Sequence, residues 1–182
     1  MTQAIGMIEF KTVSAGITAT DQMVKTANVK LLEAEVVCPG KYISLISGDL
    51  SAVKAAVERG QATRPEEFID SFVLGNPDES IFPAIYGSAE VDNVSALGVL
   101  ETYDASQIIV AADVAAKTAV VKLIELRIAK GMCGKSYMLI TGEVAACEAA
   151  IERAKQAAGD KGMFLDSSVI ANPDKELWKN IL

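Results

Sequence analysis

The segment DQMVKTANVKLLE at residues 21–33 returns as DVAAKTAVVKLIE at residues 113–125. Extended outward at a constant offset of 92, residues 4–33 align with residues 96–125 and share 14 identities in 30 positions. Background composition gives on the order of two such matches in a window of this length. The chain is therefore predicted to contain the same structural unit twice.

The repeat continues beyond this segment with small changes of length. Residues 40–59 match residues 134–153 with 10 identities in 20, and an Asn-Pro-Asp triplet closes each copy. The two length changes fall between matched blocks, as expected for loops. We predict a first domain over residues 1–92 and a second over residues 93–182.

Each copy is predicted to fold as βαββαβ. An apolar strand precedes a helix of small residues, two strands joined by a glycine-containing turn, a second helix and a closing strand. Gly60 and Gly159 are expected to end the second helices, and Asn76 and Asn172 to cap a short closing helix. The elements are expected at residues 5–10, 15–27, 29–37, 42–47, 48–60 and 68–74, and at residues 97–102, 105–119, 121–129, 136–141, 142–159 and 164–171. This order is the ferredoxin-like α+β arrangement, in which helices cover one face of an antiparallel sheet.

Composition excludes several classes of function. The 24 acidic and 17 basic side chains give a net charge of −7, so nucleic acid is not an expected partner. The chain has no histidine, which removes Ser-His and Cys-His nucleophile pairs and imidazole bases. Glu9 and Glu101 are matched carboxylates without acidic neighbours, and we assign them structural roles. An enzyme is not expected.

The three cysteines and the apolar runs indicate the compartment. Cys38, Cys133 and Cys147 are an odd number at wide spacing, which is not a disulfide framework and favours a reducing cytosol. The apolar runs are far shorter than the roughly 18 residues typical of a membrane span, so no membrane association is expected. Cys147 lies on the apolar face of its predicted helix, and we expect it in the core.

The strings AIGMIEF, DQMVKTANVKLLE and PGKYISLISGDLSAVKAAVERG resemble the shell proteins of bacterial microcompartments. The resemblance runs through both copies, and it is greatest to a tandem-domain shell protein of propanediol-utilisation compartments. It implies a non-permuted tandem protein that forms a homotrimer imitating a hexamer. It also implies a place in a microcompartment shell within the cytoplasm, with hexameric shell proteins as neighbours.

The turn Val37-Cys38-Pro39-Gly40-Lys41 carries the closest part of this resemblance. In the family this turn lines the central opening of the tile, and its cysteine ligates an iron–sulfur cluster. The resemblance therefore implies one [4Fe-4S] cluster per trimer, held by Cys38 of three chains, with electron transfer across the shell, or cluster delivery, in support of a redox enzyme. A [4Fe-4S] cluster normally takes four cysteines, and a threefold axis brings three together. Without the family, Cys38 is a lone thiol whose usual role is an inert filler.

The second copy has Met132-Cys133-Gly134-Lys135 at the equivalent turn, and the resemblance places this turn at the same opening. A cysteine here departs from the glycine-rich pattern of the family. Cys133 has three open roles: a fourth ligand, a competitor for the metal, or an idle thiol. Lys41 and Lys135 either form a ring of cations at the opening or point away from it, and the sequence does not choose.

Lys25 and Lys117 occupy matching positions near the ends of the first helices. The resemblance places them at the tile edge, whereas the ordinary role of such lysines is a solvated helix end. Related proteins often have arginine before the closing proline, where this chain has Asn76 and Asn172, so its edge contacts are expected to differ. The alternative function is a soluble sensor or carrier of small molecules built from duplicated ferredoxin-like domains.

Overall fold

The computed structural model describes residues 4–91 and 94–182. The chain divides into two compact units, the first made of residues up to 77 with residues 129–134, and the second of residues 78–128 and 135–182. A six-residue loop of the second sequence copy therefore belongs to the first unit. The predicted domain boundary between residues 92 and 93 lies outside the described residues.

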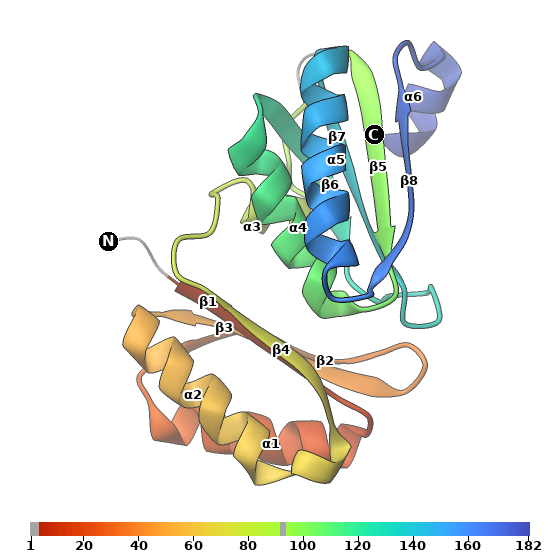
Figure 1. Cartoon of the computed structure of the whole chain (residues 1–182). Helices are drawn as coiled ribbons and strands as arrows, with labels where there is room; N and C mark the ends of the chain where they lie inside the picture. The colour runs from red at the N-terminus through yellow and green to blue at the C-terminus, as the bar shows by residue number, and fades with distance from the viewer. Residues whose placement is uncertain (1–3, 92–93) are drawn as a thin grey trace. The chain divides into compact units, whose positions relative to one another are not determined.

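The first unit contains a four-stranded antiparallel sheet with strand order β2-β3-β1-β4. Figure 1 shows α1 and α2 side by side on one face of this sheet. A single turn of 3-10 helix, Pro65–Glu67, precedes the last strand. The bounds are β1 Ala4–Phe10, α1 Val13–Thr26, β2 Lys30–Val37, β3 Lys41–Gly48, α2 Leu50–Thr63 and β4 Phe68–Leu74.

The second unit repeats this topology with strand order β6-β7-β5-β8. The pairing register is also repeated, since Glu9 lies opposite Asp70 in the first sheet and Glu101 lies opposite Asp166 in the second. Its elements are α3 Ile81–Ile85, β5 Ala96–Thr102, α4 Ala105–Thr118, β6 Val121–Arg127, β7 Ser136–Gly142, α5 Val144–Gly159, β8 Phe164–Ile170 and α6 Lys175–Ile181. The predicted tandem ferredoxin-like fold is confirmed.

Small residues let the helices of the first unit pack closely on its sheet. Ile8 of β1 lies in the same buried cluster as Met23 of α1 and Val53 of α2. Gly60 lies inside α2, which continues to Thr63, so the prediction that Gly60 ends the helix was wrong. A Cβ at Gly60 would lie 2.8 Å from Ile8 Cδ1, which shows that this glycine serves close packing and not helix termination. In the second copy α5 does end at Gly159.

The predicted asparagine caps were also wrong. Asp174, two residues after Asn172, is the N-cap of α6, and its carboxylate accepts a hydrogen bond from the Glu176 N–H at 2.8 Å. In the first copy the Asp78 carboxylate accepts one from the Ser80 N–H at 3.0 Å, just before α3. Asparagine and aspartate cap about equally well, so the order of the Asn-Pro-Asp triplet did not by itself distinguish them.

Candidate functional site

The β2–β3 hairpin turn carries the predicted metal ligand. The Gly40 N–H donates to the Val37 carbonyl at 2.9 Å and closes the turn, and Gly40 has a φ of 100°, which favours glycine. Cys38 is half-buried, whereas Pro39 and Gly40 are exposed. The Cys38–Pro39 peptide bond is cis. The structure therefore presents Cys38 at the tip of a hairpin at the surface of the first unit.

The loop Ala129–Gly134 of the second copy, which joins β6 to β7, contacts this turn within the first unit. The Cys38 N–H donates to the Ala129 carbonyl at 3.0 Å. At the other end of the loop, a Cβ built on Gly134 would lie 3.2 Å from the Cys38 carbonyl oxygen. Both ends of the loop thus touch the main chain of Cys38, and the exposed Cys133 is one residue away from the second contact.

Two non-glycine residues of this loop adopt left-handed backbone conformations. Ala129 has a φ of 51° and Cys133 a φ of 53°. Such conformations cost of order 1–3 kcal/mol each and persist only where surrounding contacts hold them. The hydrogen bond from Cys38 to Ala129 is one such contact, and the close approach of Gly134 to Cys38 is another. The loop therefore keeps its shape by packing against the hairpin turn.

Lys41 forms an ion pair with Glu9, so its charge is not presented to solvent. The Glu9 side chain is fully buried, and the Lys41 side chain is 16% exposed. Burial raises the pKa of Glu9, while the hydrogen bond and charge of Lys41 act in the opposite direction. Lys135, the counterpart of Lys41, is exposed in the second unit. Of the two lysines predicted near the central opening, Lys41 is therefore paired with a buried carboxylate. This pairing is consistent with the structural role assigned to Glu9.

A cluster of Glu33, Glu35 and Lys130 was not predicted from the sequence. The Lys130 Nζ lies 2.7 Å from a Glu35 carboxylate oxygen and 3.9 Å from one of Glu33. Burial and a hydrogen bond with Glu35 raise the pKa of Glu33 to about 7, against the lowering effect of Lys130. Lys130 therefore joins the second-copy loop to strand β2 of the first unit.

A signal for this cluster was present in the sequence. Glu33 and Glu35 are two residues apart on a strand, so their side chains share a face. In the second copy the equivalent of Glu35 is Arg127, whose Nε donates to Glu125 at 2.9 Å. The first copy replaces this local pair with two acids, which need a cation from elsewhere in the chain.

The raised pKa of Glu33 predicts a pH dependence of stability. Its protonated form is favoured in the folded state, so this contribution is complete below about pH 4.5 and is lost as the pH rises through about 7. Glu33→Gln keeps a hydrogen-bond donor at every pH. We expect this variant to unfold at higher urea concentration than the wild type at pH 8, with the difference shrinking toward pH 4.5. An unchanged difference across that window would contradict the assignment.

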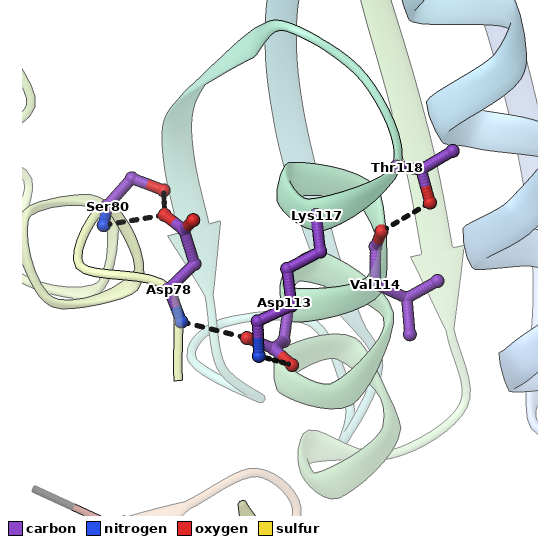
Figure 2. A network of polar contacts seen from close by, with 6 residues as sticks. All are labelled: Asp78, Ser80, Asp113, Val114, Lys117 and Thr118. Atoms are coloured by element: carbon purple, nitrogen blue, oxygen red, sulfur yellow. Dashed lines mark hydrogen bonds and ion pairs between the residues drawn. The ribbon is translucent and has the colours of Figure 1, made fainter. Parts of the chain in front are cut away.

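The predicted edge lysines each pair with an aspartate one helical turn earlier. Lys25 Nζ lies 2.7 Å from Asp21, and Lys117 Nζ lies 2.7 Å from Asp113. Figure 2 shows that Asp113 also accepts a hydrogen bond, at 2.8 Å, from the N–H of Asp78. Asp113 is buried while Asp21 is half exposed, so Lys25 has greater freedom to reach another molecule.

The two aspartates offer a matched comparison. Asp113→Ala is expected to lower the free energy of unfolding by about 1.5–3 kcal/mol, because it removes a buried charged acceptor from the half-buried N–H of Asp78. Asp21→Ala removes an exposed helix pair with Lys25 and an exposed hydrogen bond from the Gln22 side chain, and is expected to cost about 0.3–0.5 kcal/mol. Urea denaturation of both variants checks this. Equal losses would show that the hydrogen bond from Asp78 contributes nothing to stability.

The third cysteine lies apart from the candidate site. Cys147 is fully buried in α5, as predicted, and burial together with the charge of Glu143 raises the pKa of its thiol. Within residues 4–91 and 94–182 of a single chain, no group of three or more Cys, Asp or Glu residues is arranged to hold a metal ion. No described helix is both long and apolar enough to cross a bilayer.

The duplicated fold with its paired hairpin turns defines a class of protein. A BMC domain matches at residues 4–77 and again at residues 96–173, which together are most of the chain. The chain belongs to the BMC-domain family of bacterial microcompartment shell proteins. It is a tandem member in the non-permuted order, because each copy begins with strand β1 or its counterpart β5.

Comparison with individual proteins gives the same result. The chain is 38% identical to the bacterial microcompartment shell protein PduT of Citrobacter freundii, over 100% of this chain and 99% of PduT. A microcompartment protein from Desulfitobacterium hafniense DCB has a crystal structure that matches with a TM-score of 0.90 at 40% identity, over 98% of this chain and 99% of that chain. A fused permuted hexameric shell protein from the RMM microcompartment matches with a TM-score of 0.65 at 22% identity, over 87% and 82%, and shares the fold alone.

Proposed function

We propose that this structural shell protein forms a homotrimeric tile with one [4Fe-4S] cluster at its centre, ligated by Cys38 of three chains, for electron transfer across the shell. The position of Cys38 at the tip of an exposed hairpin turn carries this proposal. A thiol at the surface of one chain can converge with its copies around a threefold axis, whereas a buried thiol such as Cys147 cannot.

The donor set fits an iron–sulfur cluster. Thiolates are the usual ligands of such clusters, and the two thiols at this site, Cys38 and Cys133, come from adjacent loops of the first unit. Three copies of Cys38 would supply three thiolates, and Cys133 or a ligand from outside the protein would complete the set. When bound, the cluster supplies one-electron transfer. Cys38 would hold it, and the packed second-copy loop positions Cys38 through its main-chain N–H.

An exposed apolar hollow on the second unit supports assembly into an oligomer. The hollow, of about 430 Å³, lies on the sheet face that α6 partly covers, and Ile170 and Leu177 at its rim are 39% and 40% exposed. Its lining is Leu97, Val99, Glu101, Tyr137, Leu139, Ile170, Leu177 and Ile181. Apolar surface of this kind marks an interaction site on a soluble protein, and a second chain is the occupant that a tile provides.

Other shell proteins and a redox enzyme are the partners of this proposal. A trimer carries a formal charge of 3 × −7 = −21, so its cluster lies in an acidic tile in which Lys135 offers exposed cations near the second turn. Lys25 and Lys117 are the residues proposed to contact neighbouring hexameric tiles. The exposed Lys25 is the stronger candidate, because its partner Asp21 is itself half exposed.

Anaerobic purification tests the cluster directly. Iron and sulfide analysis with EPR after reconstitution should show a cluster in the wild type and its loss in Cys38→Ser. Cys147→Ser is the matched control and should retain the signal, because this thiol is buried in α5. A colourless wild-type protein after reconstitution would exclude the cluster and leave a shell protein with an ordinary opening.

Light scattering tests the tile. A trimer has a mass of 3 × 19.2 = 57.6 kDa, whereas the alternative of a small-molecule sensor predicts a monomer or a dimer. Cys38→Ser should remain trimeric, since the apolar hollow and not the thiol is proposed to support assembly. A stable wild-type monomer would count against tiling.

A further inference from the structure

Cys38 and Cys133 lie 95 positions apart in the sequence but belong to one local structure. The loop Ala129–Gly134 contacts Cys38 at both of its ends, through the hydrogen bond from the Cys38 N–H to Ala129 and through the close approach of Gly134 to the Cys38 carbonyl. Cys133 therefore lies in a short loop whose two ends are both fixed against the main chain of the other cysteine.

One ion pair joins the loop to strand β2, and a second fixes Lys41 beside Gly134. Lys130, at the start of the loop, reaches Glu35 on strand β2, three residues before Cys38. Lys41, at the start of β3, is fixed to the buried Glu9, and its Nζ lies 3.3 Å from the position that a Cβ of Gly134 would occupy. The separation of the two thiols is thus limited by contacts on both sides of each cysteine.

The accessibility of the cysteines separates this pair from the third. Cys133 is exposed and Cys38 is half-buried, so a dissolved oxidant reaches both. Cys147 is fully buried, and burial raises the pKa of its thiol, which leaves it unreactive. In a reducing compartment, cysteines that pair reversibly are typical of redox-sensing sites and not of structural disulfides.

We propose that Cys38 and Cys133 of one chain form a reversible disulfide when a low-molecular-weight disulfide is the oxidant. The Cys133 thiolate attacks one sulfur of oxidised glutathione, forming a mixed disulfide and releasing one reduced glutathione. The Cys38 thiolate then attacks the Cys133 sulfur, and the second reduced glutathione leaves. The protein loses two protons and two electrons, and one oxidised glutathione becomes two reduced molecules. The disulfide would regulate cluster binding, because oxidation withdraws Cys38 as a ligand, and this regulatory role rests on the proposed cluster.

Mass spectrometry of the metal-free full-length chain tests the disulfide without reference to iron. After oxidised glutathione, the intact mass should fall by two hydrogen atoms, and thiols counted by maleimide labelling in denaturant should fall from three to one. A peptide map should join the segments that contain Cys38 and Cys133. Cys147→Ser should form the same bond. Cys38→Ser and Cys133→Ser should each stop at the glutathione adduct.

Other outcomes overturn the proposal. A wild-type chain that stops at a glutathione adduct would show that the two thiols do not meet. A disulfide-linked dimer or trimer on a non-reducing gel would show that Cys133 pairs with another chain.

The regulatory part has its own readout. Oxidation before reconstitution should prevent iron uptake by the wild type, and treatment of the oxidised protein with dithiothreitol should restore it. Uptake by the oxidised wild type would overturn the regulation, whereas absence of iron from every reduced sample would overturn the cluster and leave the disulfide standing.

Discussion

Lys41→Met is expected to lower the free energy of unfolding by about 3–5 kcal/mol, the usual cost of leaving one member of a buried ion pair without its partner. Glu9 is fully buried on β1, and Lys41 lies diagonally across from it on β3, two residues before Ile43, the cross-strand partner of Glu9. Methionine fills the space of the lysine stem without supplying a charge. The carboxylate of Glu9 then stays buried in the folded state without the cation that offsets its desolvation.

A second substitution separates charge from packing. Glu9→Gln combined with Lys41→Met removes both charges and is expected to recover most of the stability lost in the single variant. Lys135→Met is the matched control, because Lys135 is exposed, and it should change stability by less than about 0.5 kcal/mol. If the double variant is no more stable than Lys41→Met alone, the loss comes from packing and not from the unpaired carboxylate.

The ion pair of Glu9 with Lys41 also predicts that the stability lost in Lys41→Met depends on pH. Burial already raises the pKa of Glu9, and removal of Lys41 takes away the interaction that opposes this rise. The folded state of Lys41→Met therefore favours protonated Glu9, and its stability deficit is smallest at low pH. We expect the deficit to grow as the pH rises through the raised pKa, as measured by urea denaturation at several pH values.

The duplication made the fold predictable from the sequence. Each strand was seen twice, so the ends of β4 at Phe68 and Leu74 were predicted without error, and the others lay within two residues. The errors arose where one local signal has two structural meanings. Gly60 reads as a helix terminator in the sequence, but in the structure it makes room for Ile8 and Met23 beneath a helix that continues.

The candidate site was predictable only in part, for a physical reason. The hairpin turn at Cys38 is formed by neighbouring residues, and its Pro-Gly pair predicted it. The cluster of Glu33 and Lys130 depends instead on a second-copy loop that packs on the first unit, 97 residues along the chain. No local propensity reports such a pairing. The replacement of Arg127 by Glu35 between copies was the one available clue.

At one buried contact between helix and strand, the two copies differ in how side-chain volume is divided between the two positions. Gly16 of α1 and Tyr42 of β3 are buried in contact, and a Cβ at Gly16 would lie 2.5 Å from Tyr42 Cγ. The aligned positions of the second copy hold Ile108 and Ser136, which are also buried. A glycine with a tyrosine in one copy thus corresponds to an isoleucine with a serine in the other, an exchange of volume between helix and strand.

Gly16→Ile is therefore expected to lower the free energy of unfolding by about 3 kcal/mol, because the new side chain overlaps the ring of Tyr42. Tyr42→Ser removes that ring and is expected to cost about 3–5 kcal/mol through the cavity it leaves. Combined, the two changes reproduce the pairing of the second copy. We expect the double variant to be more stable than the sum of the single losses predicts, with a coupling energy of about 1–3 kcal/mol.

Urea denaturation of the wild type, both single variants and the double variant measures this coupling. Ser14→Ile on the exposed face of the same helix is the matched control for the effect of a branched residue, which is at most about 0.7 kcal/mol. Strictly additive losses would mean that the tyrosine ring moves aside in Gly16→Ile and that the volumes of helix and strand are set independently. A positive coupling would mean that the volumes at the two positions are set together, as the paired difference between the copies indicates.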